Sequence, residues 1–269
     1  MRDRKIDDQA LADAYNAALA LEKAGRIDAA VEAYTRVLTL DPADHGGVAV
    51  RLAALRRGEV PAKAPDAYVA TLFDQHAEDF EEILVDALGY GVPGLARDRL
   101  DALGLGPFAR VLDLGCGTGL MAEALGERAG EIVGLDLSEA MVDMAFDKDI
   151  YDGLYVAEAV EFLEDNDEPA FDLIAAADVL PYVGALDALF AGMAANLNPG
   201  GVVVFSSEAD ESADAGFAVT PHQRFAHSRG YIETQLEASG FALVEATDIN
   251  VRMQDGAPTP GQLILARHR

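Results

Sequence analysis

The chain has 269 residues, 51% of them hydrophobic, which is enough to bury the core of one α/β domain and of a smaller attached unit. Its single cysteine excludes an intrachain disulfide, and no apolar run approaches the roughly 20 residues needed to cross a bilayer, so we expect a cytoplasmic protein without membrane contacts. The formal net charge is -27, and the acidic residues are unevenly distributed. Residues 1–60 hold 9 Lys and Arg against 10 Asp and Glu, whereas residues 61–269 hold 11 Lys and Arg against 37 Asp and Glu. The surface of the second part should therefore repel nucleic acid.

Two stretches with apolar residues at helical spacing, 11–24 and 27–40, flank Gly25 and predict a helical hairpin. The hairpin resembles one tetratricopeptide repeat, in which a glycine turns the chain and small residues let two helices approach. The matching positions are Gly25, Ala30, Tyr34, Val37, Asp41 and Pro42, whereas Ala14, Ala17, Ala18 and Leu21 stand where that family more often has Trp, Leu and Gly. A third helix over 46–57 is expected to cap the hairpin. Since one repeat is too short to form a peptide groove, we expect a docking or dimerisation element.

A Pro-rich stretch over residues 58–65 has the character of a linker. We therefore place a helical domain at 1–60, a linker at 61–65 and a larger domain at 66–269. Helical and strand-like segments alternate in the larger domain. The expected helices lie near 66–88, 92–103, 118–127, 138–146, 184–197 and 229–239, and the expected strands near 110–114, 131–136, 154–157, 171–177, 201–206, 241–251 and 261–268.

This alternation predicts an α/β fold with a Rossmann-like, mostly parallel seven-stranded sheet and helices on both faces. The last two strands are joined only by residues 253–260, too few for a parallel crossover. We therefore expect the last strand to run antiparallel, in a hairpin at the edge of the sheet.

A short apolar strand ending at Leu114 is followed by Gly115, Gly117 and Gly119 at alternate positions. Glycine permits a tight strand-to-helix turn and removes the Cβ that would collide with a nucleotide-like ligand. A nicotinamide fingerprint would be G-x-G-x-x-G, whereas this loop reads G-x-G-x-G with Asp113 two residues before the first glycine. The spacing favours S-adenosylmethionine over NAD.

The next strand ends in Asp136, 21 residues after Gly115. A carboxylate there can accept hydrogen bonds from both hydroxyls of a ribose. The same geometry serves NAD, so Asp136 indicates a nucleoside without identifying it.

Together these residues resemble the class I S-adenosylmethionine-dependent methyltransferases over residues 66–269, and most specifically the bacterial group that carries a tetratricopeptide-like hairpin. The resemblance implies S-adenosylmethionine as cofactor, and the antiparallel closing strands are typical of that family. It also implies these cofactor-binding residues: Asp113, Gly115, Cys116, Gly117 and Gly119 around the methionine and ribose, Asp136 at the ribose, Leu137 on the adenine, Glu158 and Ala159 near its amino group, and Asp178 beside the methyl donor. Glu158 stands where many relatives have Asp. Instead of contacting the cofactor, Asp178 could be a helix cap or a buried residue that makes structural hydrogen bonds.

Two segments outside the cofactor strands offer acceptor contacts. The predicted helix over 66–88 carries Tyr68, Phe73 and His76, and a long acidic insertion over 208–220 leads to His222, Arg224, His227 and Tyr231. We take Asp178, His227 and Tyr231 as catalytic candidates, and Tyr68, Phe73, His76, His222, Arg224 and His227 as substrate-binding candidates. His222 and His227 have the alternative of structural or surface histidines, and their spacing does not favour a metal.

The expected reaction is methyl transfer from S-adenosylmethionine to a small-molecule thiol, amine, hydroxyl or carboxylate by in-line displacement, in which positioning supplies much of the catalysis. Only some acceptors would need a base. Two alternatives remain open, a protein methyltransferase or an assembly factor whose helical hairpin docks a partner. A homodimer formed through the hairpin is a further possibility.

Overall fold

The structure, a computed structural model, describes residues 8–213 and 216–269. The first seven residues of the predicted helical domain and residues 214–215 of the predicted insertion lie outside the described residues.

Three helices, α1 (Asp8–Lys23), α2 (Ile27–Leu40) and α3 (Val48–Ala54), form the N-terminal unit. Gly25 turns the chain between α1 and α2 with a φ of 71°. Ala18, Ala30, Tyr34, Val37, Val48 and Leu52 make a small core of their own. The predicted hairpin and its third helix are therefore present, although likeness to a tetratricopeptide repeat stays a prediction.

Seven strands build the main sheet in the order β3-β2-β1-β4-β5-β9-β8. Their bounds are β1 Phe108–Leu114, β2 Ala129–Asp136, β3 Gly153–Val156, β4 Phe171–Ala176, β5 Leu197–Ala209, β8 Phe241–Gln254 and β9 Ala257–His268. The first five strands run parallel, and β9 runs antiparallel to both β5 and β8. The predicted α/β fold with an antiparallel last strand is thereby confirmed, with β9 inside the sheet and β8 at its edge.

Two short strands, for which the sequence predicts no element, extend this sheet after β5. β6 (Phe217–Val219) pairs antiparallel with β7 (Phe225–His227), and β7 pairs in parallel with the end of β5. Three-residue strands show too few alternations for a period to be recognised in the sequence.

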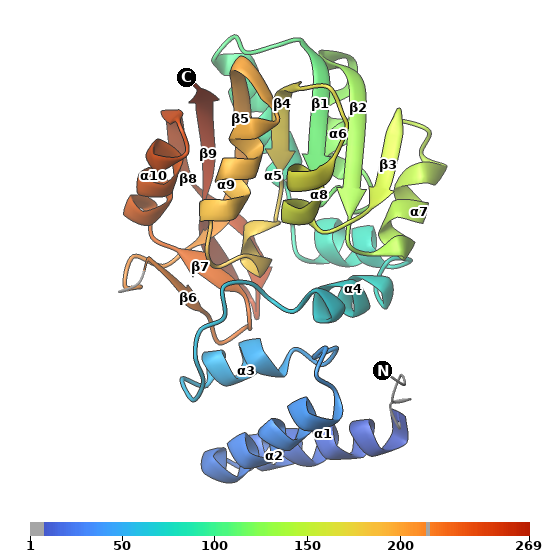
Figure 1. Ribbon diagram of the computed structural model, residues 1–269, viewed down its shortest axis with the longest axis vertical. Coiled ribbons are helices and arrows are strands. Elements are labelled where there is room, and N and C mark those ends of the chain that lie inside the picture. The colour runs from blue at the N-terminus through green and yellow to red at the C-terminus, as the bar shows by residue number, and fades with distance from the viewer. Residues whose placement is uncertain (1–7, 214–215) are drawn as a thin grey trace.

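Helices cover both faces of the sheet (Figure 1). Their bounds are α4 Asp66–Asp74, α5 Val92–Ala102, α6 Leu120–Leu125, α7 Glu139–Asp147, α8 Ala159–Asp165, α9 Asp187–Ala195 and α10 Arg229–Ala238. On β1, Leu112 and Leu114 face the core beneath α8, α9 and α10, whereas Val111 faces the core beneath α5 and α6. This alternation of side chains is why the strand is apolar at nearly every position.

The predicted helix over 66–88 is interrupted. α4 ends at Asp74, and a π-helical turn, η1 (Glu82–Ala87), follows after a few residues of turn. α4 and η1 lie beyond the carboxyl ends of the parallel strands, and the N-terminal unit lies beyond α4 (Figure 1). We call the segment from α4 to η1 the lid.

Residues 62–64, which we call the strap, tie the N-terminal unit to the sheet domain. The carbonyl of Ala62 accepts hydrogen bonds from the N–H groups of Gly184 and Ala185 at 2.8 Å each, and the N–H of Ala64 donates to the carbonyl of Tyr182 at 2.8 Å. Val50 of α3 packs in one cluster with Ala64, Val69 and Phe225. Two residues of the stretch expected to be a linker, Ala62 and Ala64, are thus hydrogen-bonded to the sheet domain.

Among the helices in residues 8–213 and 216–269, none has the length and apolar character that a bilayer crossing requires.

Candidate functional site

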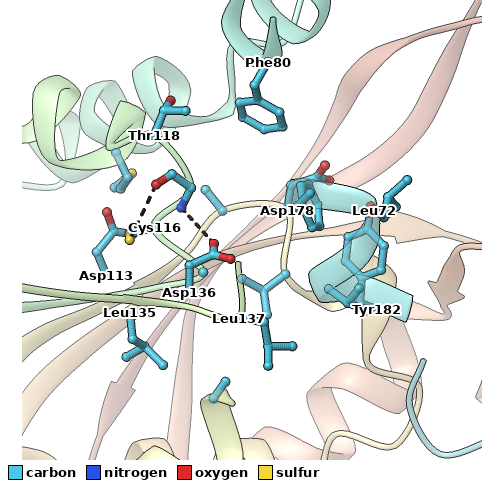
Figure 2. A pocket seen from close by; sticks show the side chains of 18 of the residues that line it. Leu72, Phe80, Asp113, Cys116, Thr118, Leu135, Asp136, Leu137, Asp178 and Tyr182 are labelled. Atoms are coloured by element: carbon cyan, nitrogen blue, oxygen red, sulfur yellow. Dashed lines mark hydrogen bonds between the residues drawn. The ribbon is translucent and has the colours of Figure 1, made fainter. Parts of the chain in front are cut away.

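A cavity of about 290 Å³ opens at the carboxyl ends of β1, β2 and β4, beneath the lid. Parallel strands of an α/β sheet place their loops at this edge, and ligands of such folds bind there. Figure 2 shows side chains from the glycine loop, from the end of β2 and from the lid turned toward one space.

The glycine loop forms one wall of the cavity. Gly115 has a φ of 62°, and a Cβ at this position would lie 2.6 Å from Cγ2 of Val179. Gly117 has a φ of 53°, and its Cβ would meet only Phe80, at 3.8 Å. Gly115 is therefore required by packing, whereas Gly117 keeps the cavity free for a ligand to approach the backbone.

Asp113 is a buried carboxylate at the end of β1, with an exposed fraction of 1%. Its Oδ2 accepts a hydrogen bond from the Tyr151 hydroxyl at 2.7 Å, while its Oδ1 has no partner among the described residues. Burial raises the pKa of Asp113 to about 7, against the lowering effect of the Tyr151 hydrogen bond. A buried acceptor without a partner beside a cavity indicates a ligand that donates.

Asp136 holds the turn at the end of β2. Its Oδ2 accepts the N–H of Gly117 at 3.0 Å (Figure 2). Its Oδ1 accepts the N–H of Ser138 at 2.9 Å. Burial raises the pKa of Asp136, although these backbone hydrogen bonds oppose the shift. The carboxylate thus joins the glycine loop to the following loop, and Leu137 lies beside it on the cavity wall.

Glu158 caps α8 at the side of the cavity near β3. Its Oε2 accepts the N–H of Glu161 at 2.8 Å, and its Oε1 lies 3.3 Å from Nζ of Lys63 in the strap. The side chain is only 7% exposed. A capping carboxylate of this kind explains why α8 begins at Ala159, a helix that the sequence analysis did not predict.

Asp178 follows β4 with a φ of 62°, a left-handed conformation that is uncommon outside glycine. Its N–H donates to Oγ of Ser206 at 2.9 Å, and its carboxylate lies 3.1 Å from Nη2 of Arg224 and 3.4 Å from Nη1 of Arg252. Residues held this way cluster at functional sites, because only their surroundings can maintain the conformation.

Glu208 completes a group that we call the ionic quartet: Asp178, Glu208, Arg224 and Arg252. Oε1 of Glu208 lies 3.2 Å from Nε of Arg224 and accepts a hydrogen bond from Arg252. Asp178 and Arg224 line the cavity, whereas Glu208 and Arg252 are 5% and 2% exposed and lie outside its lining. Two positive and two negative charges make the quartet neutral, so it presents polar groups to the cavity without a net charge.

Aromatic side chains cover the cavity between the lid and the quartet. The ring of Phe73 packs edge-on against Phe80 and Tyr182, with centroid distances of 6.0 and 5.4 Å. The Arg224 guanidinium lies 5.0 Å from the centroid of Tyr182, and burial raises the pKa of that tyrosine to about 12. The wall opposite the glycine loop is therefore mostly apolar.

Two carboxylates hold the lid on the cavity. Oδ1 of Asp74 accepts a hydrogen bond from Oγ of Ser138 at 2.6 Å. Oε1 of Glu81 accepts one from Oγ1 of Thr118 at 2.6 Å and pairs with Nζ of Lys148 at 2.7 Å. The lid is therefore attached to both of the loops that Asp136 connects.

Most of the predicted cofactor-binding residues meet at the cavity. Those that line it are Asp113, Gly115, Cys116, Gly117, Asp136, Leu137, Glu158, Ala159 and Asp178. Gly119 lies outside the lining; it begins α6 with a φ of 96° and would bring a Cβ to 3.3 Å from Ile150 and Tyr151. A side chain at this position would therefore crowd Ile150 and Tyr151.

The predicted acceptor residues separate into two groups. Phe73, His76 and Arg224 line the cavity. Tyr68 instead packs in the cluster of Val50 and Phe225, and His222 is 45% exposed, 3.8 Å from Asp255.

His227 and Tyr231, two of the catalytic candidates, lie outside the lining of this cavity. His227 is fully buried on β7; its Nδ1 bonds to Oγ of Ser207 at 2.9 Å and its Nε2 to the carbonyl of Val183 at 2.9 Å. Burial lowers the pKa of His227 to about 4. The ring of Tyr231 stacks on it, and the Tyr231 hydroxyl accepts the N–H of Leu186 at 3.1 Å. Both side chains hold the inserted strands to the domain.

Three charged residues of the site were missed in the sequence. Glu208 and Arg252 lie in strands of the main sheet, and Lys63 lies in the expected linker. A charged residue in a strand or a linker is normally solvated, so no local pattern distinguishes these three.

The chain matches the methyltransferase domain family over residues 89–246. It is 35% identical over 102 residues to the ubiquinone biosynthesis O-methyltransferase of Alkalilimnicola ehrlichii, a match covering 36% of this chain and 41% of that protein. The chain thus spans less than half the length of the curated relatives it matches.

Solved structures of similar fold include an S-adenosylmethionine-dependent methyltransferase from Mesorhizobium loti, at 26% identity and a TM-score of 0.51 over 66% of this chain and 100% of that one. A second, from Clostridium acetobutylicum, has a TM-score of 0.55 at 18% identity over 73% of this chain and 99% of that one, and the likeness there is one of fold alone.

Proposed function

Because the chain belongs to the methyltransferase domain family, we propose that it transfers a methyl group from S-adenosylmethionine to a small-molecule acceptor. The observation that carries this proposal is a pair of carboxylates, the buried Asp113 and the partly buried Asp136, at the ends of adjacent strands on either side of a glycine loop. The similarity to a ubiquinone biosynthesis O-methyltransferase and to an S-adenosylmethionine-dependent methyltransferase supports it.

The residues present fit this cofactor. The unpartnered Oδ1 of Asp113 suits the ammonium of the methionine part, and each oxygen of Asp136 keeps a lone pair for a ribose hydroxyl. The cavity beside Gly117 leaves space that a Cβ would take. Leu137, Glu158 and Ala159 supply an apolar side chain, an acceptor and a small residue for the adenine.

On the acceptor side, we propose that Asp178 and Arg224 orient the acceptor and that Phe73 and Tyr182 exclude water. The sulfonium of bound S-adenosylmethionine supplies an electrophilic methyl group, so alignment of the acceptor is the chief requirement on the protein. The Asp178 carboxylate accepts a hydrogen bond from a hydroxyl or amine, and Arg224 donates to a neighbouring oxygen. The aromatic wall favours an acceptor with an apolar body.

Calorimetry with the purified chain tests the cofactor. We expect binding of S-adenosylmethionine and S-adenosylhomocysteine and no comparable heat with NAD. Release of S-adenosylhomocysteine from a panel of hydroxyl- and amine-bearing metabolites then identifies the acceptor. Binding of NAD alone would remove the proposal.

The affinity for S-adenosylhomocysteine should depend on pH through Asp113. A carboxyl with a pKa of about 7 is mostly protonated at pH 6, and only its ionised form attracts an ammonium. Ligand binding therefore releases a proton at low pH, and the affinity falls as pH falls. We expect binding about tenfold weaker at pH 6 than at pH 8, measured by calorimetry.

Asp113→Asn is the control for this pH dependence. The amide does not titrate, so the variant should bind more weakly at every pH and with little variation between pH 6 and pH 8. A wild-type affinity that is flat across this range would contradict the role given to Asp113.

We propose that residues 1–60 form a tetratricopeptide-like unit and 66–269 the catalytic domain, with the strap inside the linker at 61–65. The three helices and their own core support this division. As the expected role of this unit is docking or dimerisation, light scattering should report a dimer mass for the full chain and a monomer mass without residues 1–60. A monomer in both cases would argue against dimerisation. The cytoplasmic location stays a prediction.

A further inference from the structure

The strap brings a cation from outside the family-matched segment to the wall of the cavity. Nζ of Lys63 lies 2.8 Å from Oδ1 of Asp66 and 3.3 Å from Oε1 of Glu158. All three residues line the cavity, next to Leu137 and Ala159. Lys63 therefore stands at the side where the proposed function puts the adenine.

The backbone of Lys63 is fixed independently of its ammonium. Residues on either side of it, Ala62 and Ala64, make the hydrogen bonds that attach the strap to residues 182–185, and Lys63 itself bridges to Val183. Ala64 is 2% exposed and packs against Val50 of the N-terminal unit. The ammonium is thus presented to Glu158 by a rigid segment.

Glu158 needs such a partner. One of its oxygens caps α8 by accepting the N–H of Glu161, and the other is bound by Lys63. Without Lys63, the carboxylate could rotate about its bond to the rest of the side chain. Glutamate has one more rotatable bond than the aspartate of many relatives, so its position is less well fixed by its own backbone.

The charges suit this arrangement. Lys63 is 39% exposed and Asp66 is 42% exposed, so their pairing contributes little to stability. Although burial opposes it, the hydrogen bond with Asp66 and the charge of Glu158 raise the pKa of Lys63. The ammonium therefore stays charged and can hold a carboxylate in place.

We infer that Lys63 is a positioning residue for recognition of the nucleobase: it fixes Glu158 so that this carboxylate accepts a hydrogen from the exocyclic amino group of adenine. The inference rests on the proposed function. It makes the strap, and through it the N-terminal unit, part of the cofactor site.

The test compares two ligands by calorimetry on the full chain. One is S-adenosylhomocysteine, and the other is its analogue with hydrogen in place of the 6-amino group. The wild-type chain should prefer the amino compound about tenfold, since a hydrogen bond to a charged acceptor is lost in the analogue. Lys63→Met should reduce that preference to about twofold, and Lys63→Arg should keep it.

Lys148→Met is the matched control. Lys148 also pairs with two carboxylates, but these are Glu81 of the lid and Glu123 of α6. Its replacement should change the affinity for both ligands by the same factor and leave the preference unchanged.

Each outcome of this test decides a separate point. If Lys63→Met lowers the affinity for both ligands by the same factor, Lys63 has only a structural role, and the positioning role is overturned. Wild-type chain that binds neither ligand overturns the proposed function as well. Because the readout is a ratio within one variant, partial loss of folded protein does not affect it.

Discussion

Replacement of Arg252 by Met is expected to lower the free energy of unfolding by about 3 kcal/mol, because it leaves two carboxylates of the ionic quartet with one cation. Arg252 is 2% exposed, and both of its partners, Asp178 and Glu208, are nearly buried. A buried charge that loses its partner keeps the full cost of its desolvation. Urea unfolding followed by circular dichroism measures the change.

Two further variants separate charge from packing. Glu208→Gln in the Arg252→Met background removes the unpaired charge and should recover part of the loss. Arg229→Met breaks a pair with Asp248, which is 92% exposed, and should change stability little. If Arg252→Met unfolds at the wild-type urea concentration, the quartet does not contribute in the way described.

The fold and the cofactor side of the site follow from short-range patterns. Strand ends of a parallel sheet meet at one edge, so Asp113 after one apolar run and Asp136 after the next had to lie close together. The spacing of the glycines predicts the tight loop between these two residues. Nothing about the rest of the molecule was needed to bring these groups to one cavity.

The acceptor side depends on pairings between distant segments. His227 is a candidate base in the sequence because it follows a long insertion. In the structure it belongs to β7, which pairs with β6, and it is buried against Ser207. Arg252 meets Asp178 across 74 residues of sequence. The register of the strands decides which strand positions carry buried charges. Register depends on pairing between distant segments, so the local sequence does not show it.

The lid was predicted as one helix for a related reason. Apolar spacing continues from α4 into η1, and the break between them is stabilised by contacts of Asp74 and Glu81 with residues of other loops. Helix propensity gives no sign of such contacts.

Asp136→Asn is expected to weaken binding of S-adenosylhomocysteine about 100-fold, which corresponds to about 2.7 kcal/mol. The carboxylate receives the N–H groups of Gly117 and Ser138 and, in the proposed function, the ribose hydroxyls. An amide keeps one acceptor oxygen and places an NH₂ group against one of the two backbone donors, so a backbone contact and the charge are lost together. Isothermal calorimetry gives the affinity.

Asp172→Asn is the matched control for this substitution. Asp172 also accepts two backbone N–H groups, from Ala109 and Arg110 at 3.0 and 3.1 Å, but it lies at the opposite end of β4 from the cavity. Both of these N–H groups bond to Oδ2, which an amide can keep as its oxygen, so Asp172→Asn should lose less stability than Asp136→Asn. Only Asp136→Asn should lose affinity. Equal affinities in the two variants would mean that the Asp136 carboxylate shapes the loop without binding the ligand, and the nucleoside site would then have to be carried by Asp113 and Glu158.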